Sequence, residues 1–354
     1  MKILHLLDIP WWSGLSAYAF DCIEAQIALG HEVSLACQKN TLPFRKAKES
    51  SIQTIAIAGR QSWKAPINFI LIGIIVLRLK PNYIIAHTGS THWVALWWGS
   101  QTGIPVIRVR ASSPSTRNFY FNAKLYLNTY RIITASEKLK TACLMTLGNE
   151  LKERISILYP PMDINALPQI TNGVKPIKIG LLARLDPVKG HSNFLKAAKI
   201  VQDKFPGTEF HLAGPEENIK WHSLLKEAKN IGIQKIFYHG FLAQEKVLKF
   251  ISDCSIGIIA STGSEEVSRA LLEWISLGKP VVASSVGCIP EILKHGEGGY
   301  IVSSKNSVLM AERIIELISQ PELIKKMGDF NKEFCKNNFS IDRFQSKWEK
   351  ILKQ

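Results

Sequence analysis

Glu265 and Glu273 are two carboxylates separated by seven residues, a spacing that suits the binding of hydroxyl groups. The apolar residues around Glu273 recur at helical intervals and predict one buried stripe: Val267, Ala270, Leu271, Trp274 and Ile275. Glu273 falls off that stripe, and Glu265 comes just before the helix, after a predicted strand. Both carboxylates can then accept hydrogen bonds from the hydroxyls of one ligand, such as a sugar or a ribose.

The same residues also fit a purely structural role. Residues 262–265 match a capping box, and Arg269 with Glu273 forms an ordinary i,i+4 ion pair. From spacing alone, this structural role is the better explanation. A second cluster in the sequence changes that weighting.

Arg184 and Lys189 bring two cations to the loop between a predicted strand at 177–185 and the helix after Gly190. The start of a helix already favours an anion, through its free backbone N–H groups and its dipole. The two cations therefore fit a diphosphate group. The alternative is two surface charges on an ordinary loop, and the loop by itself does not decide between these readings.

Together the two segments resemble the signatures of glycosyltransferase family 4, whose members are retaining enzymes of the GT-B fold. Residues 265–273 resemble its E-x7-E signature, and residues 184–190 resemble its R-x4-K-G element without a gap. The tail at 271–293 also resembles the family closely. The resemblance covers nearly the whole chain, is strongest at 177–302, and is closest in kind to bacterial cell-surface polysaccharide or lipopolysaccharide transferases.

This resemblance implies a role for each matched residue. Glu265 would contact the transferred sugar, and Glu273 would contact the donor ribose. Arg184, Lys189 and Gly190 would hold the donor diphosphate, and the two cations would stabilise the charge that grows as the nucleotide departs. The donor substrate would be a nucleotide-diphosphate sugar. We expect no metal ion and no other cofactor, since the chain lacks the D-x-D triplet typical of metal-dependent sugar transfer.

Further donor contacts are implied at three places. Family members follow the first Glu with Gly and an aromatic residue whose backbone contacts the sugar, whereas this chain has Glu266, Val267 and Ser268. A Gly-Gly loop of the family approaches the donor phosphates, and Gly14 matches its second Gly. His87 ends the fourth predicted strand, where the family places a His beside the sugar. A tight turn at Gly14 and a structural role for His87 are the alternatives.

Short β-branched runs alternate with helical patterns along the chain and predict parallel sheets covered by helices, an α/β class. The predicted strands are at 2–9, 32–37, 52–58, 83–88, 105–111, 131–136, 155–160, 177–185, 208–214, 233–241, 255–262, 280–285 and 298–304, and the last helices at 306–319, 321–337 and 341–352. Prolines with Asn172-Gly173 break the pattern near 160–176 and mark a domain boundary.

We therefore expect the GT-B fold, with two doubly wound Rossmann-like domains that face a central cleft. Open α/β sheets bind ligands at the carboxyl ends of their strands, so the site residues should lie in the loops there. The expected parts are an acceptor-binding domain at 1–170, a donor-binding domain at 171–340 and a C-terminal helix at 341–354 that crosses back to the first domain.

The chain of 354 residues carries a net charge of +15, which favours anionic partners such as nucleotides, nucleic acid or an acidic membrane surface. Tryptophans in the first half accompany basic residues: Trp11, Trp12, Trp93, Trp97, Trp98, Arg108, Arg110, Arg117, Lys124 and Arg131. Such a mixture can grip lipid headgroups or a lipid-linked acceptor, although Trp is usually buried in the core. Arg110 and Arg117 are candidates for contacts with the acceptor.

Six cysteines lie far apart without a C-x-x-C pair, which indicates reduced thiols and no zinc site. The N-terminus lacks the pattern of a signal peptide, so we expect a cytoplasmic protein, with peripheral contact to the inner face of the cell membrane as a hypothesis. The apolar run at 67–77 is too short to span a bilayer and is expected to form a buried helix.

The resemblance implies transfer of a hexose with retention, and three other functions are alternatives to it. A basic nucleic-acid-binding protein would show a basic stripe or a binding module, and neither is evident, so no nucleic acid is expected as a partner. A nicotinamide-dependent oxidoreductase would carry G-x-G-x-x-G after a first strand, and this fingerprint is absent. A GT-B hydrolase or epimerase acting on the nucleotide sugar remains the nearer alternative.

Overall fold

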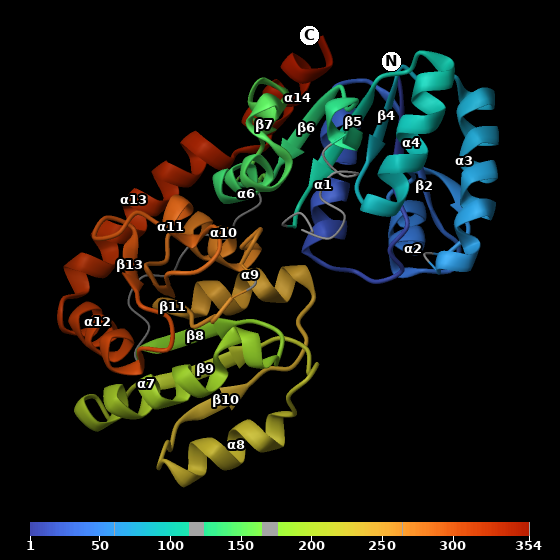
Figure 1. Cartoon of the computed structure of the whole chain (residues 1–354). Coiled ribbons are helices and arrows are strands. Elements are labelled where there is room, and N and C mark those ends of the chain that lie inside the picture. Colours follow the sequence, from blue (N-terminus) through green and yellow to red (C-terminus); the bar gives the residue numbers. More distant parts are fainter. Residues whose placement is uncertain (60, 113–123, 165–175, 264, 354) are drawn as a thin grey trace. The chain divides into compact units, whose positions relative to one another are not determined.

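Two compact units make up the chain, Met1–Pro161 with Ile341–Gln354 as unit 1, and Met162–Ser340 as unit 2 (Figure 1). The structure is a computed structural model, and it describes residues 1–59, 61–112, 124–164, 176–263 and 265–353. Each unit is a parallel β-sheet covered by helices, as the alternating sequence pattern predicts. The predicted α/β class is thus confirmed.

The sheet of unit 1 has seven parallel strands in the order β3-β2-β1-β4-β5-β6-β7. The register pairs Ile3 of β1 with Val33 on one side and with Tyr83 on the other. From β1, the strands follow one another through β2 to β3 on one side of the sheet. On the other side of β1 they continue from β4 through β5 and β6 to β7. The strands are β1 (Lys2–Leu7), β2 (Glu32–Gln38), β3 (Gln53–Ile57), β4 (Tyr83–Ala86), β5 (Val106–Arg110), β6 (Arg131–Thr134) and β7 (Ile155–Ile157).

Alternation along β1 divides the helices of unit 1 between two faces of the sheet. Leu4 and Leu6 pack in an apolar cluster with residues of α3 and α4, whereas His5 between them bonds to Gln26 of α1. The α-helices of this unit include α1 (Gly14–Ala28), α2 (Leu42–Glu49), α3 (Ala65–Leu79), α4 (Gly89–Thr102), α6 (Glu137–Leu147) and α14 (Ile341–Lys353). Short 3₁₀ helices lie at Ser62–Lys64 and Asn149–Arg154.

Helix α3 is the apolar run that we expected to be buried, and that expectation is wrong for one of its faces. Ile72, Ile75 and Val76 are in the core, as predicted. Four apolar side chains of the helix are exposed to solvent: Ile67, Ile70, Ile74 and Leu77. Because α3 is apolar on all sides, the periodicity of its sequence does not show which face of the helix meets the sheet.

The sheet of unit 2 has six parallel strands in the order β10-β9-β8-β11-β12-β13. They are β8 (Lys178–Leu182), β9 (Glu209–Ala213), β10 (Ile236–Tyr238), β11 (Ile256–Ile259), β12 (Val281–Ser284) and β13 (Gly299–Val302). The helices are α7 (His191–Lys204), α8 (Trp221–Asn230), α9 (Gln244–Asp253), α10 (Arg269–Ser276), α11 (Ile289–Ile292), α12 (Ser307–Ser319) and α13 (Pro321–Phe339), with a 3₁₀ turn at Pro187–Lys189.

Two strand glycines seat helix α10 against the sheet of unit 2. A Cβ atom on Gly180 or Gly257 would lie 2.6 or 2.4 Å from ring atoms of Trp274, which is fully buried. Ile179 and Leu181, on the other face of β8, join the apolar cluster formed with α7 and α12. The glycines therefore let α10, which carries Glu273, approach the sheet closely.

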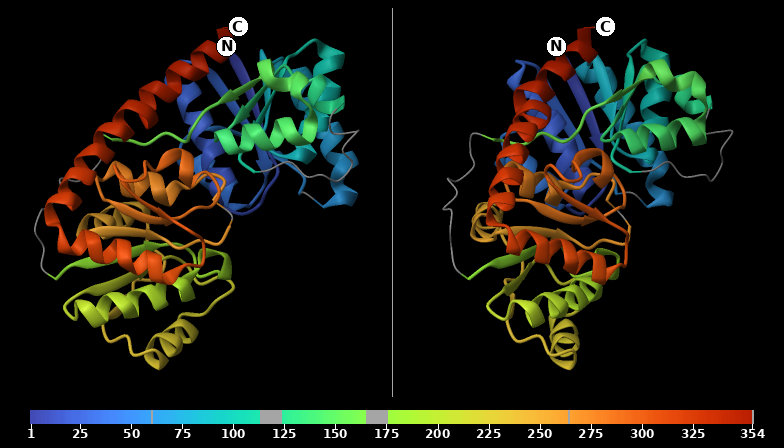
Figure 2. Two further views of the ribbon diagram at one scale, coloured as in Figure 1. Left: turned by 60° about the vertical axis from the view of Figure 1, so that its left-hand side comes forward. Right: turned by 90° about the vertical axis from the view of Figure 1, so that its left-hand side faces the viewer.

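The last helix, α14, is part of unit 1 and packs beside α1 (Figure 2). Phe344, Trp348, Ile351 and Leu352 form its buried face. The hydroxyl of Tyr83 in β4 donates a hydrogen bond to the carbonyl of Leu352 at 3.1 Å. These contacts attach the end of the chain to the sheet in which the chain begins.

All thirteen predicted strands and the three C-terminal helices are present, with ends that differ by a few residues. Helix α2 was not predicted, because its eight residues, LPFRKAKE, carry too few apolar positions to show a period. Within the part of the chain that the structure describes, no helix has the length and apolar character needed to cross a bilayer.

Candidate functional site

The strand order of unit 2 reverses between β8 and β11, and ligands of open α/β sheets bind at such reversals, beyond the carboxyl ends of the strands. The loop after β8 carries Arg184, Asp186 and Lys189, and the loop after β11 carries Ser261 and Glu265. The two segments singled out in the sequence thus meet at one edge of one sheet.

Lys189 and Glu265 form an ion pair across this reversal, with 2.6 Å between Nζ and Oε1. Glu265 is 6% exposed. Ser261 Oγ donates to Oε1 at 2.6 Å, and Ser268 Oγ donates to Oε2 at 2.7 Å. Three donors from three segments therefore fix the orientation of this carboxylate. A charge-assisted arrangement of this kind presents its remaining lone pairs in a defined direction.

Gly190 and Gly287 allow the loops of this site to come together. Gly190 has φ +70°, and a Cβ atom there would lie 1.9 Å from the carbonyl oxygen of Ala260. Gly287 has φ +58°, and its Cβ atom would lie 2.1 Å from the carbonyl oxygen of Glu265. Both positions need glycine for the backbone conformation and for space. The role of Gly190 is visible here in the fold itself.

Arg184 extends from the end of β8 toward solvent, with 44% of its side chain exposed. Its Nη2 atom lies 3.6 Å from Oδ2 of Asp186. Asp186 also accepts bonds from the backbone N–H of Val188 at 3.0 Å and from Asn218 Nδ2 at 2.6 Å. Burial by itself raises the pKa of Asp186, but these hydrogen bonds and the nearby Arg184 and Lys189 outweigh it and lower the pKa.

Asp186 was missed by the sequence analysis. Its side chain caps the 3₁₀ turn at Pro187–Lys189 and so fixes the backbone that carries Lys189. An Asp directly before a Pro at the start of a turn is a recognisable signal for such a cap. Ser261 was also missed, because no sequence pattern shows that its hydroxyl reaches the carboxylate of Glu265.

Glu273 lies in the middle of α10, off the buried stripe and half-buried, as its position in the pattern predicts. Gln244 Nε2 donates to its Oε1 atom at 3.3 Å. Burial raises the pKa of Glu273, while the hydrogen bond from Gln244 and the charge of Arg269 oppose that shift. Of the predicted stripe, Leu271, Trp274 and Ile275 are buried, whereas Val267 and Ala270 are half-buried.

Helix α10 begins at Arg269, six residues after the position 263 at which a capping box at 262–265 would start the helix. The bonds of the Glu265 side chain go to Lys189, Ser261 and Ser268, so it does not serve as that cap. The backbone of Ser268 donates to Cys288 Sγ at 3.4 Å. Val267 and Ser268 both lie in the short segment between Glu265 and the helix, where the resemblance placed contacts to the sugar.

In unit 1, His87 follows β4 and is buried at the carboxyl edge of the sheet. Its Nε2 atom lies 2.9 Å from Nδ1 of His5, and His5 Nε2 lies 2.9 Å from Gln26 Oε1. Burial, together with His5 and Arg108, lowers the pKa of His87 well below its ordinary value. His87 is therefore a neutral, internally bonded residue in this structure, and its role beside a sugar stays a prediction.

Gly14 is the first residue of α1, behind the N-cap Ser13. A Cβ atom built on Gly14 meets no atom within 4 Å, so neither the fold nor a positive φ requires glycine there. The turn-forming alternative thus gains no support from the structure. Contact with donor phosphates remains a prediction for Gly14.

Arg110 ends β5 and is buried, with Nη1 donating to the hydroxyl of Tyr126 and Nη2 to the carbonyl of Ser112 at 3.1 Å. Arg108 is buried beside it and donates to the carbonyls of Ala86 and Val109 at 2.9 and 2.8 Å. Burial raises the pKa of Tyr126, but the two guanidinium groups outweigh it and lower the pKa. Arg117 lies outside the described residues.

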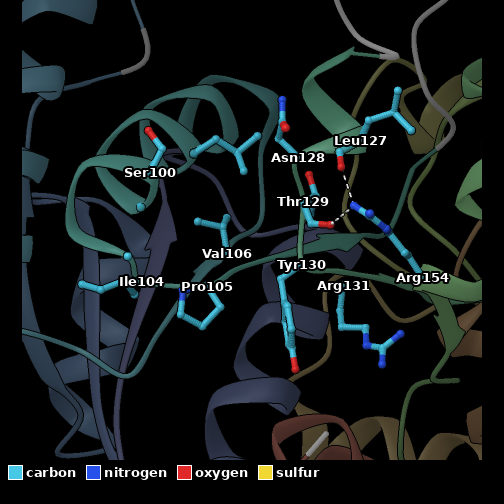
Figure 3. A pocket seen from close by; sticks show the side chains of 13 residues that line it. Ser100, Ile104, Pro105, Val106, Leu127, Asn128, Thr129, Tyr130, Arg131 and Arg154 are labelled. Atoms are coloured by element: carbon cyan, nitrogen blue, oxygen red, sulfur yellow. Dashed lines mark hydrogen bonds between the residues drawn. The ribbon is translucent and has the colours of Figure 1, made fainter.

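A cavity of about 720 Å³ opens at the amino ends of β5 and β6 in unit 1, away from the carboxyl edge (Figure 3). Pro105 and Val106 line one side, and Tyr130 and Arg131 line another. Arg154 Nη1 donates to the carbonyl of Thr129 at 3.2 Å at its rim. None of the predicted site residues lines this cavity.

Comparisons with known proteins match unit 2 to a family of sugar-transferring enzymes. Residues 163–334 match the sequence model of the family described as glycosyl transferases group 1. An uncharacterized glycosyltransferase of Methanocaldococcus jannaschii is 27% identical over 243 residues, which cover 67% of this chain and 61% of that protein. The chain thus matches less than two thirds of this relative's length.

Two solved structures share the whole fold. The crystal structure of HepE from Anabaena in complex with UDP and glucose has a TM-score of 0.85 at 18% identity, with both chains fully covered. The apo form of the lipopolysaccharide outer core galactosyltransferase WaaB has a TM-score of 0.79 at 14% identity, with 99% of each chain covered. At these identities the likeness shows the fold alone: two Rossmann-like domains of the GT-B type.

Proposed function

We propose that this protein transfers a sugar from a nucleotide-diphosphate donor to a glycan or lipid-linked acceptor, and the match of residues 163–334 to the glycosyl transferases group 1 model supports this proposal. The observation that carries the proposal is the Lys189–Glu265 pair at the strand-order reversal of unit 2, beside the exposed guanidinium of Arg184. The ammonium group of Lys189 can bind phosphate and the fixed carboxylate of Glu265 can bind hydroxyl groups. Lys189 Nζ and Glu265 Oε1 lie 2.6 Å apart.

In this proposal, each charged residue of the site binds a different part of the donor. Arg184 and Lys189 hold the diphosphate, since an ammonium group with three N–H donors can bond to phosphate oxygen while it remains paired with Glu265. The same cations stabilise the negative charge that develops on the diphosphate as the glycosidic bond breaks. Gly190, which has no side chain, leaves the backbone of this loop open to the phosphates.

Glu265 and Glu273 act as acceptors of hydrogen bonds in this proposal. Glu265 has lone pairs beyond those used by Lys189, Ser261 and Ser268, and it orients a hydroxyl of the transferred sugar. Glu273, on α10, accepts bonds from the ribose hydroxyls. Val267 and Ser268 supply backbone contacts to the sugar, and the proposed contacts of Gly14 and His87 with the donor come from unit 1.

We further propose a hexose transfer with retention at the anomeric carbon and without a metal ion. Glu265 is held by three donors, and such bonding reduces its strength as a nucleophile, so attack by the acceptor on the face that the diphosphate leaves is favoured over a covalent intermediate. The anomeric configuration of the product, followed by proton NMR at early times, tests retention. Full activity after treatment with EDTA is expected.

The acceptor and the cellular site complete the proposal. We propose a cell-surface glycan or lipid-linked acceptor, and support comes from WaaB, a protein of the same fold that is described as a lipopolysaccharide outer core galactosyltransferase. Unit 1 supplies the acceptor site, with Arg110 and Arg117 as candidates. We also propose work on the cytoplasmic side of the membrane, where the exposed Trp11, Trp93 and Trp97 would contact lipid headgroups.

Thermal unfolding in the presence of a panel of nucleoside diphosphates and nucleotide sugars tests the central proposal. A ligand present at 100 times its dissociation constant should stabilise the protein by about 2.7 kcal/mol. Arg184→Ala should abolish this stabilisation for nucleoside diphosphates. If no nucleoside diphosphate or nucleotide sugar shifted the melting temperature of the wild-type chain, the proposed function would be wrong. Rapid cleavage of the donor without any acceptor would favour a hydrolase or epimerase instead.

A further inference from the structure

The strand order of unit 1 also reverses, between β1 and β4, so this unit has its own favoured place for a ligand. Asp8 is the residue directly after β1, and Ser90 and Thr91 lie in the first turn of α4, shortly after β4. These side chains come together at the carboxyl edge of the sheet, on the two strands that flank the reversal. The position corresponds to that of Lys189 and Glu265 in unit 2.

Asp8 is a buried carboxylate with one oxygen left without a partner. The side chain is 1% exposed. Its Oδ2 atom accepts a hydrogen bond from Ser90 Oγ, whereas Oδ1 has no hydrogen-bond partner within the described residues. The ion pairs of the described chain do not include Asp8 either. A buried carboxylate oxygen that has lost water without gaining a donor is unfavourable, so a missing donor is the natural explanation.

A small cavity of about 30 Å³ lies against this carboxylate. Its polar lining comes from Asp8, Gln61, Asn68, Ser90 and Thr91. The rest of the lining is apolar: Ala65, Ile72, Trp93 and Val94. The volume suits one group of the size of water, which excludes a whole sugar ring but admits a single hydroxyl.

Asn68, Ser90 and Thr91, three of the other polar residues of the cavity, are already hydrogen-bonded within the protein. Asn68 Oδ1 accepts from the backbone of Ala58 at 2.8 Å, and its Nδ2 atom donates to the carbonyl of Ala58 at 3.2 Å. Thr91 Oγ1 lies 2.9 Å from Thr88 Oγ1. The group that enters the cavity therefore has to satisfy Asp8 Oδ1, and it must be a donor, because a carboxylate is an acceptor.

A neutral donor fits the cavity better than a cation. From Ser50 to Ser136 the sequence contains nine Lys and Arg residues and not one Asp or Glu. Most of the cavity lining comes from this stretch. The positive electrostatic potential of the stretch therefore opposes a cationic ligand, including an ammonium group such as that of lysine. An anion is excluded by Asp8 itself. A hydroxyl group carries no charge and supplies the donor that Asp8 lacks.

We infer that the cavity at Asp8 receives one hydroxyl group of the acceptor sugar, which donates a hydrogen bond to Asp8 Oδ1. The inference rests on the proposed function, and it makes Asp8 a specificity-determining residue of the acceptor site. Ser90 orients the carboxylate through its bond to Oδ2. Asp8 thereby selects acceptors that carry a hydroxyl at the position facing the cavity.

Binding of methyl glycosides to the full-length chain tests the inference without any transfer reaction. The probes are the methyl glycosides of glucose, galactose, mannose and N-acetylglucosamine, and saturation-transfer NMR gives their dissociation constants. For the best of them, Asp8→Asn should raise the dissociation constant about 10- to 100-fold, as expected for the loss of a hydrogen bond to a charged group. Affinity for UDP, measured by calorimetry, should not change.

Matched variants separate binding from folding. Asp21→Asn makes the same chemical change on α1 of the same unit, away from the cavity, and should leave glycoside binding unchanged. Ser90→Ala should weaken binding less than Asp8→Asn, because it frees the carboxylate without removing it. Deoxy analogues of the best glycoside test the same contact with the wild-type protein. The analogue that lacks the hydroxyl facing Asp8 should bind the wild type about as weakly as the complete glycoside binds the Asp8→Asn protein.

Several results would overturn the inference. Equal glycoside affinity of the Asp8→Asn protein and the wild type is one, and a changed melting temperature with unchanged affinity would assign the cavity to a structural water. Absence of binding of every methyl glycoside to the wild type would also refute it. Failure of the proposed function is distinct, because it would appear as a lack of stabilisation by nucleoside diphosphates and nucleotide sugars.

Discussion

The carboxylate of Glu265 is held in place before any ligand arrives. Lys189, Ser261 and Ser268 approach its two oxygens at 2.6, 2.6 and 2.7 Å, from the loops after β8 and β11 and from the start of α10. Groups fixed in this way need no rearrangement when charge develops in the site, which is the basis of electrostatic preorganisation. The same bonds make Lys189 important for the stability of unit 2.

Removal of the Lys189 ammonium group should destabilise the protein. Lys189→Ala leaves the buried Glu265 carboxylate without its cation, so the free energy of unfolding should fall by about 3 kcal/mol. Urea denaturation measures this change. In the double variant Lys189→Ala/Glu265→Gln the buried charge is gone, and part of the loss should be recovered. A double variant less stable than Lys189→Ala would contradict a charge-based explanation.

Replacement of Glu273 should weaken nucleotide binding without unfolding the protein. Glu273→Ala removes a half-buried carboxylate on α10, and the affinity for the preferred nucleoside diphosphate should fall about 10-fold, or about 1.4 kcal/mol. Calorimetric titration provides the measurement. Glu312→Ala, an exposed position on α12 of the same unit, is the control. Unchanged affinity in a folded Glu273→Ala protein would refute the ribose role.

At the scale of the elements, the side chains between β1 and β4 form a buried polar line in unit 1. Gln26 of α1, His5 of β1 and His87 after β4 are joined by two contacts of 2.9 Å. Burial lowers the pKa of His5 to about 4, although the bond to Gln26 opposes the shift. Both histidines are therefore neutral in the folded chain at neutral pH, and both become charged in the unfolded chain below pH 6.5.

This difference predicts how stability depends on pH. Since the pKa of each imidazole is lower in the folded state, the unfolded state binds more protons, and the free energy of unfolding falls as the pH drops below 6.5. The contribution of His5 is complete above pH 6.5 and is lost down to about pH 4, with a slope of up to about 1.4 kcal/mol per pH unit.

The variant His5→Gln tests this prediction, because it removes one of the groups that take up a proton on unfolding. The free energy of unfolding should therefore depend less steeply on pH between about 6.5 and 4.5. Denaturant unfolding at several pH values gives the slope for each protein. His222→Gln, at an exposed position on α8, is the control for the substitution itself. A His5→Gln protein with the wild-type slope would show that His5 does not couple protonation to folding.

At the scale of the whole molecule, the charge of +15 is distributed unevenly, since residues 50–136 contain no Asp or Glu. Helices α3 and α4 of this stretch expose six large apolar side chains: Ile67, Ile70, Ile74, Leu77, Trp93 and Trp97. Ile70 is the most exposed of them, at 59%. An apolar and aromatic surface in a basic region has the composition of surfaces that contact anionic lipid headgroups.

The membrane proposal therefore makes a specific prediction for this surface. Ile70→Glu/Ile74→Glu should reduce the fraction of protein that sediments with phosphatidylglycerol-containing vesicles by at least about 10-fold, through lost apolar burial and added negative charge. Met145→Glu, on α6 with Met145 at 83% exposure, is the matched control. Binding should also weaken as the salt concentration rises from about 0.05 to about 0.5 M, because the Debye screening length becomes about threefold shorter. Equal sedimentation of both variants would refute the role of α3.

The sequence predicted the strands well because each is a short β-branched run bounded by turn residues. Arg184, Lys189, Glu265 and Glu273 were singled out by their resemblance to family signatures. The structure brings Lys189 and Glu265 together, and the roles of all four in donor binding stay predictions. The sequence-based prediction failed where orientation matters. Helix α3 is apolar on all sides, so its exposed face was not recognisable. Ser261 and Asp8 look like ordinary loop residues, and their importance depends on neighbours that are far away in the chain.

By itself, then, the sequence determined the α/β class, the alternation of strands and helices and the loops that carry charge, since these follow from local periodicity and turn chemistry. Tertiary structure decided which loops meet. The reversals of strand order bring Lys189 to Glu265 across 76 positions of sequence and Asp8 to Ser90 across 82. Local patterns do not encode such pairings, because packing of the whole sheet sets which strands are neighbours.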